Sequence, residues 1–137
     1  MKLSRSQKRE GVFLLLYQSL LNDDSVEELV QSNIDAYEMV EDESITVTVK
    51  AVQDYADKAD EIINRYSATR KVARIAAISV AVMRLALYEM DCISEEEVPD
   101  KVAINEAIEL CKKYALADEY KFVSGILGSY YREKHNE

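Results

Sequence analysis

Glycine and proline are scarce in this chain, with three glycines and one proline among 137 residues. Folds built from strands and tight turns need many residues with unusual backbone angles, which glycine supplies. The scarcity therefore predicts helices joined by short polar loops. A chain of this length can bury roughly two thirds of its unfolded surface without metals or disulfides. We expect one all-α domain, or two small halves that share one core.

Apolar residues recur at helical spacing in about seven segments. The first three expected helices cover about residues 5–21, 25–40 and 44–66. A short helix over 67–75 and a mainly apolar, buried helix over 79–90 should follow. The last two helices start near Pro99 and Asp118.

Polar residues mark where several of these helices should begin. Ser4 with Gln7, and Ser25 with Glu28, have the three-residue spacing of a capping box. Ser79 is placed to cap the central helix.

The residues that catalysis or metal binding would need are missing or badly spaced. The single histidine, His135, lies two residues from the end of the chain, and no Glu-x-x-His pair exists. Cys92 and Cys111 have neither CxxC spacing nor a shared context, so we expect two free thiols. Three scattered glycines cannot build a phosphate loop. We therefore predict no enzyme, no metal site and no cofactor.

No segment predicts a membrane partner. The apolar run 11–21 follows basic residues as in a signal peptide, but polar residues interrupt it and no cleavage site follows. The run 75–83 is far shorter than the roughly 20 residues that span a bilayer. We expect a cytoplasmic protein.

Positive charge is concentrated at the start of the chain, although the net charge is −9. The first nine residues contain Lys2, Arg5, Lys8 and Arg9 and no acid. On a helix, Arg5, Lys8 and Arg9 share one face. Cations at a helix start oppose the helix dipole, which favours a functional reason for them. We interpret this face as a surface that contacts phosphates; the alternative is a solubilising helix end.

Negative charge forms a block of its own. Residues 10–49 hold ten acids and no lysine or arginine, whereas residues 62–88 hold five basic residues and no acid. The acidic block serves solubility or docks a basic protein. The two charge patterns together suggest an adaptor that binds RNA on one face and a basic protein on another.

Three motifs in the second half point to a family. Residues 84–90 read RLALYEM, residues 98–110 read VPDKVAINEAIEL and residues 121–127 read KFVSGIL. This sequence resembles the NusB family of bacterial transcription antitermination factors over the whole chain. Most of the specificity of that resemblance lies in about residues 78–127.

The resemblance implies a fold of two packed, three-helix-type bundles in one NusB-like domain over residues 1–137. The halves would meet near residues 66 and 67. It also implies that the chain binds boxA-type RNA together with the ribosomal protein NusE, within a transcription elongation complex on ribosomal RNA genes. Members of the family occur as monomers or homodimers.

The expected RNA-binding residues fall into two groups. The first group lies near the start of the chain and comprises Lys2, Arg5, Lys8 and Arg9. The second lies at the start of the last expected helix and comprises Asp118, Lys121 and Phe122. Ser6 and Gln7 stand where some family members carry arginine, so the basic face is thinner here. Phe122 has core spacing, which leaves burial and base stacking both open.

Two other functions compete with this one. A helical protein–protein adaptor with weak or no RNA binding fits the acidic total and the thinned basic helix. NusB-like domains are also fused to RNA methyltransferases. That reading is disfavoured, because the chain has no room for a methyltransferase domain and no glycine-rich loop for S-adenosylmethionine.

Overall fold

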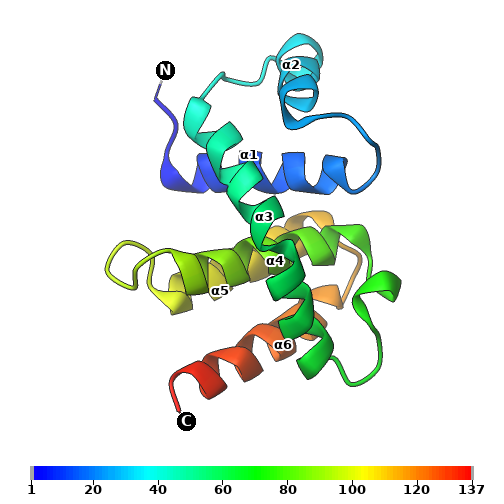
Figure 1. The fold of residues 1–137 in the computed structure, drawn as a ribbon, viewed down its shortest axis with the longest axis vertical. Coiled ribbons are helices and arrows are strands. Elements are labelled where there is room, and N and C mark those ends of the chain that lie inside the picture. Colours follow the sequence, from blue (N-terminus) through cyan, green and yellow to red (C-terminus); the bar gives the residue numbers. More distant parts are fainter. Residues whose placement is uncertain (1, 137) are drawn as a thin grey trace. The chain divides into compact units, whose positions relative to one another are not determined.

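The computed structural model describes residues 2–136, and every regular element within them is helical (Figure 1). The elements are α1 (Arg5–Ser19), α2 (Val26–Tyr37), α3 (Glu43–Tyr66), the 3₁₀ turn η1 (Val72–Arg74), α4 (Ala77–Cys92), α5 (Asp100–Tyr114) and α6 (Glu119–Lys134). The predicted all-α fold of about seven helices is confirmed. Among residues 2–136, no helix combines the length and apolar character that a membrane span requires.

The chain divides into two compact units, Met1–Asp54 and Tyr55–Glu137. The first unit contains α1, α2 and the beginning of α3, and the second contains the remainder of α3 with η1, α4, α5 and α6.

The starts of α1 and α2 carry the predicted capping boxes. The hydroxyl of Ser4 accepts the backbone N–H of Gln7 at 3.1 Å, and the Gln7 side chain accepts the N–H of Ser4 at 2.8 Å. Ser25 and Glu28 repeat this arrangement, also at 3.1 and 2.8 Å. Each box satisfies two backbone donors that a helix start otherwise leaves unpaired.

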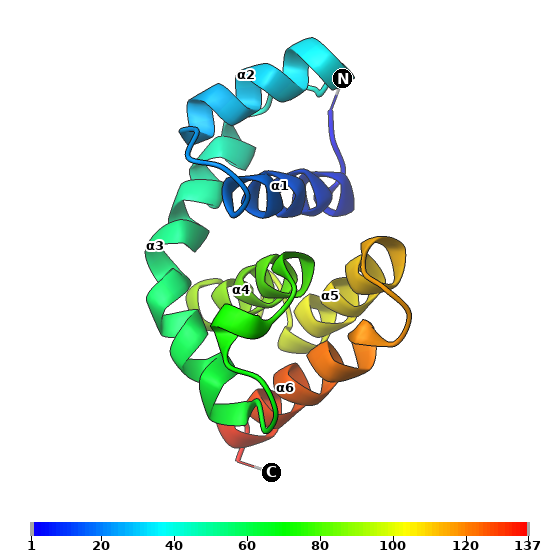
Figure 2. The same ribbon diagram turned by 90° about the vertical axis from the view of Figure 1, so that its right-hand side faces the viewer.

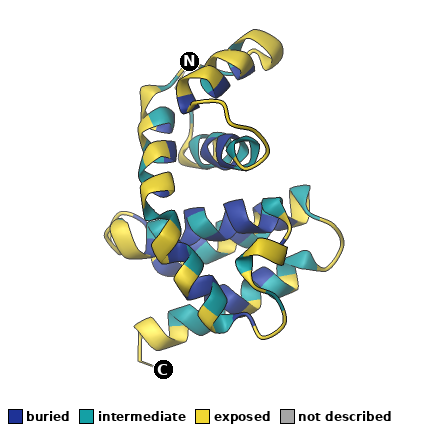
Figure 3. Ribbon diagram, turned by 45° about the vertical axis from the view of Figure 1, so that its right-hand side comes forward, coloured by how far each residue is buried: buried dark blue, intermediate teal, exposed yellow. Residues whose placement is uncertain are grey.

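The first unit buries apolar side chains from α1, α2 and the beginning of α3. Figure 3 draws the buried parts of the helices in dark blue. Phe13 and Leu16 of α1 and Leu29 of α2 are buried. Beside them Gln18 and Asn33 exchange two amide hydrogen bonds, of 3.2 and 2.7 Å. Each polar group therefore brings its own partner into the interior, as burial requires.

In the second unit α4, α5 and α6 pack against one another (Figure 2). The predicted buried central helix is confirmed, because nine of the sixteen residues of α4 are buried. The inner face of α5 includes Ala103, Ala107 and Cys111, at the four-residue spacing read from the sequence.

The predicted helix over residues 67–75 is wrong, since only the turn η1 forms there. Two side chains bond to the backbone of this segment instead. The hydroxyl of Ser67 accepts the N–H of Arg70 at 3.1 Å, and the Asn64 side chain accepts the N–H of Val72 at 2.9 Å. Such bonds offer the backbone an alternative to helical pairing.

The predicted cap at Ser79 is also wrong. Helix α4 begins two residues earlier, and Ser79 lies inside it, fully buried. Its hydroxyl donates to Oε1 of Glu119 in α6 at 3.1 Å, so its polar group serves tertiary packing. Asp118 does occupy the N-cap position of α6, but its side chain makes no capping bond.

Candidate nucleic-acid interface

The start of α1 carries the basic face predicted from the sequence. Arg5 is exposed, Lys8 and Arg9 are half-buried, and all three lie in the first turns of one helix. Lys2 is exposed just before the helix. No acidic residue lies in the first turn. Cations and the positive end of the helix dipole therefore combine here, which favours an anionic ligand.

One of these cations already forms an ion pair with an acidic residue of the same unit. The ammonium nitrogen of Lys8 lies 3.6 Å from Oδ2 of Asp42, in the loop before α3. Hydrogen bonds from Ser44 lower the pKa of Asp42, and Lys8 lowers it further, so this carboxylate stays charged. The acidic block thus neutralises part of the basic face within the first unit.

The second predicted group lies at the start of α6. Asp118 and Lys121 are both exposed, and their charged atoms are 3.8 Å apart, one helical turn from each other. A surface pair of this kind contributes about 0–1 kcal/mol, so a ligand can separate it at little cost.

Phe122 is half-buried, and an arginine that was not predicted as part of the site covers one face of its ring. The guanidinium carbon of Arg70 lies 3.9 Å from the ring centroid. Glu119 holds that guanidinium with an ion pair of 3.2 Å. The ring and the guanidinium form a stack of the type that nucleic-acid bases extend.

The structure thus brings the predicted residues together as two groups, one in each unit. Lys2, Arg5, Lys8 and Arg9 belong to the first, and Asp118, Lys121 and Phe122 to the second. Arg70 belongs to the five basic residues of the acid-free stretch 62–88, a cluster that could extend the phosphate-contacting surface, but it was not predicted individually as a site residue. Neither its stacking nor the pairing of Lys8 with Asp42 leaves a local signal, because the partners are dozens of residues apart.

Comparison with known proteins gives consistent matches. The model of the NusB family matches residues 6–132. A transcription antitermination protein NusB of Acetivibrio thermocellus is 35% identical over 134 residues, which cover 96% of this chain and 91% of that protein. A NusB of Clostridium botulinum (strain Alaska E43) is 35% identical over 129 residues, covering 91% and 96%.

Solved structures with the same fold include NusB of T. maritima, with a TM-score of 0.81 and 29% identity over 97% of this chain and 94% of that one. A further structure is described as antitermination factors NusB and NusE in complex with dsRNA. Its matching chain has a TM-score of 0.78 at 23% identity, with 96% and 99% of the two chains covered, and it supports the fold alone.

Proposed function

Because this chain belongs to the NusB family, we propose that it is a transcription antitermination factor that binds boxA-type RNA together with NusE. It is an adaptor and not an enzyme, and it acts in the cytoplasm as part of a transcription elongation complex. The observation that carries the RNA assignment is the basic start of α1, where Arg5 and Arg9 accompany a helix end with no acid in its first turn.

The physical case for RNA rests on charge placement. The chain has a net charge of −9, so its overall field repels a polyanion. Attraction must come from local cations, with Lys121 and the stack of Arg70 on Phe122 as further candidates. Few phosphate contacts give weak binding by the chain alone. A basic partner such as a ribosomal protein supplies the missing positive charge, and the acidic block of residues 10–49 can dock such a partner.

Anisotropy of a fluorescein-labelled boxA RNA tests this proposal, measured with and without the cognate NusE across a range of salt concentrations. We expect weak binding by the chain alone and tighter binding with NusE. Arg5→Ala with Arg9→Ala should weaken binding at least tenfold. The slope of log affinity against log salt is negative, and its magnitude should decrease by about 1.4, since each lost phosphate contact with a single strand removes about 0.7.

A control must remove the same charge elsewhere. Lys50→Ala with Lys58→Ala deletes two exposed cations of α3 that lie outside the proposed interface. This variant should keep both the affinity and the slope. Equal losses in both double variants would mean that only net charge matters. Tight NusE binding with no RNA gain would select the alternative, a protein–protein adaptor.

A further inference from the structure

A buried carboxylate that is not among the residues proposed for RNA lies at the start of α5. Asp100 is the first residue of that helix, and its side chain is only 1% exposed. Its Oδ2 lies 2.9 Å from Nε2 of His135 and 2.8 Å from the ammonium of Lys134, both at the end of α6. The carboxylate therefore ties two helix ends together within the second unit.

The other oxygen of this carboxylate has no partner. Oδ1 of Asp100 is buried and accepts no hydrogen bond from any described residue. An unpaired buried acceptor costs about 1–3 kcal/mol, more when it is charged. Such an atom needs an explanation, and a bound ion is one of the few available.

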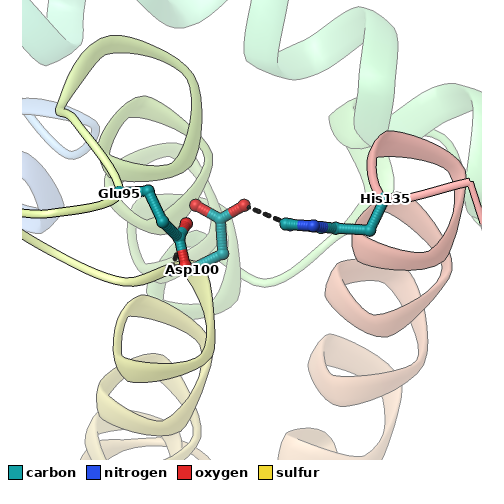
Figure 4. Close-up of side chains that lie close together, drawn as sticks. All are labelled: Glu95, Asp100 and His135. Atoms are coloured by element: carbon teal, nitrogen blue, oxygen red, sulfur yellow. Dashed lines mark hydrogen bonds and ion pairs between the residues drawn. The ribbon is translucent and has the colours of Figure 1, made fainter.

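Glu95 adds a second carboxylate beside the first (Figure 4). Its Oε2 accepts the backbone N–H of Asp100 at 3.1 Å, which holds the loop before α5 against the helix start. Ligand atoms of Glu95, Asp100 and His135 all lie within 4.8 Å of one another. Two carboxylates from the stretch that leads into α5 converge with one imidazole from the end of α6.

We propose that Glu95, Asp100 and His135 form a binding site for a zinc ion, with a fourth position left to water. Imidazole with carboxylates is a donor set that zinc accepts, whereas Mg²⁺ and Ca²⁺ prefer oxygen alone. Zinc bonds of about 2.0–2.2 Å place neighbouring ligand atoms about 3.3–3.6 Å apart, so only small side-chain shifts are needed. The orphaned oxygen of Asp100 gains the cation that it lacks.

The surroundings allow an ion to enter and stay. Glu95 is exposed and the His135 side chain is 32% exposed, so solvent reaches the site from one side. The ammonium group of Lys134 would repel a cation bound at this site. Lys134 also donates to the carbonyl oxygen of Met90, and it can keep that bond when zinc binds the carboxylate of Asp100. Zinc would then fasten the end of α6 to the start of α5.

The sequence predicted no metal site, because His135 lies 35 residues from Asp100 and forms no local motif with it. That histidine makes the test direct, since it is the only one in the chain. Zinc chloride is titrated into the full chain, purified without a histidine tag, while the single set of imidazole proton resonances is followed by NMR. We expect these resonances to shift and to saturate at one equivalent, with the melting temperature rising as zinc is added.

Variants at exposed ligands avoid the risk of unfolding that Asp100 carries. His135→Gln and Glu95→Gln should each weaken zinc binding at least tenfold, measured by calorimetry. Glu96→Gln makes the same charge change one residue along, and Cys92→Ser removes the exposed thiol. Both controls should bind as the parent does. Imidazole resonances that stay in place under excess zinc would overturn the site, as would undiminished binding by His135→Gln.

Discussion

The guanidinium of Arg84 holds the carboxylate of Asp60 through two parallel hydrogen bonds, Nε to Oδ1 at 2.9 Å and Nη2 to Oδ2 at 2.7 Å. Arg84 opens the RLALYEM motif in α4, and Asp60 lies on α3. Both side chains are less than a quarter exposed. The motif therefore begins with a residue that joins two helices of the second unit, which gives it a structural role.

Replacing the guanidinium of Arg84 by an ammonium group should lower the stability of the second unit. Arg84→Lys keeps the charge but cannot make both bonds, so we expect the free energy of unfolding to fall by about 1–2 kcal/mol. Urea denaturation followed by circular dichroism measures it. Arg132→Lys, at an exposed arginine whose Nη2 donates to the hydroxyl of Ser129 at 3.2 Å, should change stability by less than about 0.5 kcal/mol. Equal effects at both positions would contradict the role given to Arg84.

The amide pair in the first unit makes a similar test. Asn33 donates to Gln18 and to the carbonyl oxygen of Leu29, both at 2.7 Å. Asn33→Asp turns this donor into a carboxylate that faces two acceptors, and we expect a loss of about 2 kcal/mol at neutral pH. The exposed substitution Asn22→Asp should be nearly neutral. A stability of Asn33→Asp within 0.5 kcal/mol of the parent, on the order of a surface change, would show that the pair is not needed.

The two thiols should react very differently. Burial raises the pKa of Cys111 to about 11, so at pH 8 only about one molecule in a thousand carries the thiolate there. Cys92 is exposed, and its pKa is raised by partial burial and by Asp91. Ellman's reagent should label one thiol in the native protein and the second only after unfolding. In Cys92→Ser the native reaction should vanish; a remaining fast thiol would contradict the burial of Cys111.

A glycine inside α6 leaves room for a side chain. A Cβ added at Gly125 would meet nothing within 4 Å, whereas one at Gly11 would lie 3.1 Å from Cδ1 of Ile45. Since alanine is favoured over glycine in helices by about 1 kcal/mol, Gly125→Ala should stabilise the chain by about 0.5–1 kcal/mol. Gly11→Ala should gain less, because Ile45 is buried and must move. Thermal unfolding compares the two, and the reverse order would refute the comparison.

The stack at the start of α6 should matter for RNA if bases extend it. Phe122→Leu removes the ring under Arg70 and should weaken RNA binding in the presence of NusE about tenfold, since stacking on an aromatic ring is worth about 1–3 kcal/mol. Phe122→Tyr keeps the ring and should bind as the parent does. Anisotropy with labelled boxA RNA measures both, and unchanged binding by Phe122→Leu would assign the ring to packing alone.

Sequence reasoning succeeded where the determinant is local. The capping boxes at Ser4 and Ser25 need only residues three positions apart, and the burial of α4 follows from its mainly apolar composition. It failed at Ser79, whose hydroxyl was assigned to a helix end but is used by Glu119, forty residues along the chain. Propensity has no access to a partner so distant.

The candidate sites show the same contrast between local features, which the sequence reveals, and contacts between residues far apart in the chain, which it does not. A run of cations at the start of the chain is visible in the sequence, and so is the absence of acid among the first nine residues. The contacts of Lys8 with Asp42, of Arg70 with Phe122 and of Asp100 with His135 exist only once the chain has folded. The sequence therefore indicates candidate RNA-binding residues, but not which of them already have partners within the folded chain.

The first turn of α1 has a complete capping box in Ser4 and Gln7, but no acidic side chain balances the positive end of its helix dipole. A polyanion that settles there lowers the free energy of the ordered turn relative to the frayed one. Formation of this helical turn and binding of the polyanion are then thermodynamically linked, and each favours the other by the same free energy. Slower exchange of its amide hydrogens would accompany binding even if no atom of the helix changed position.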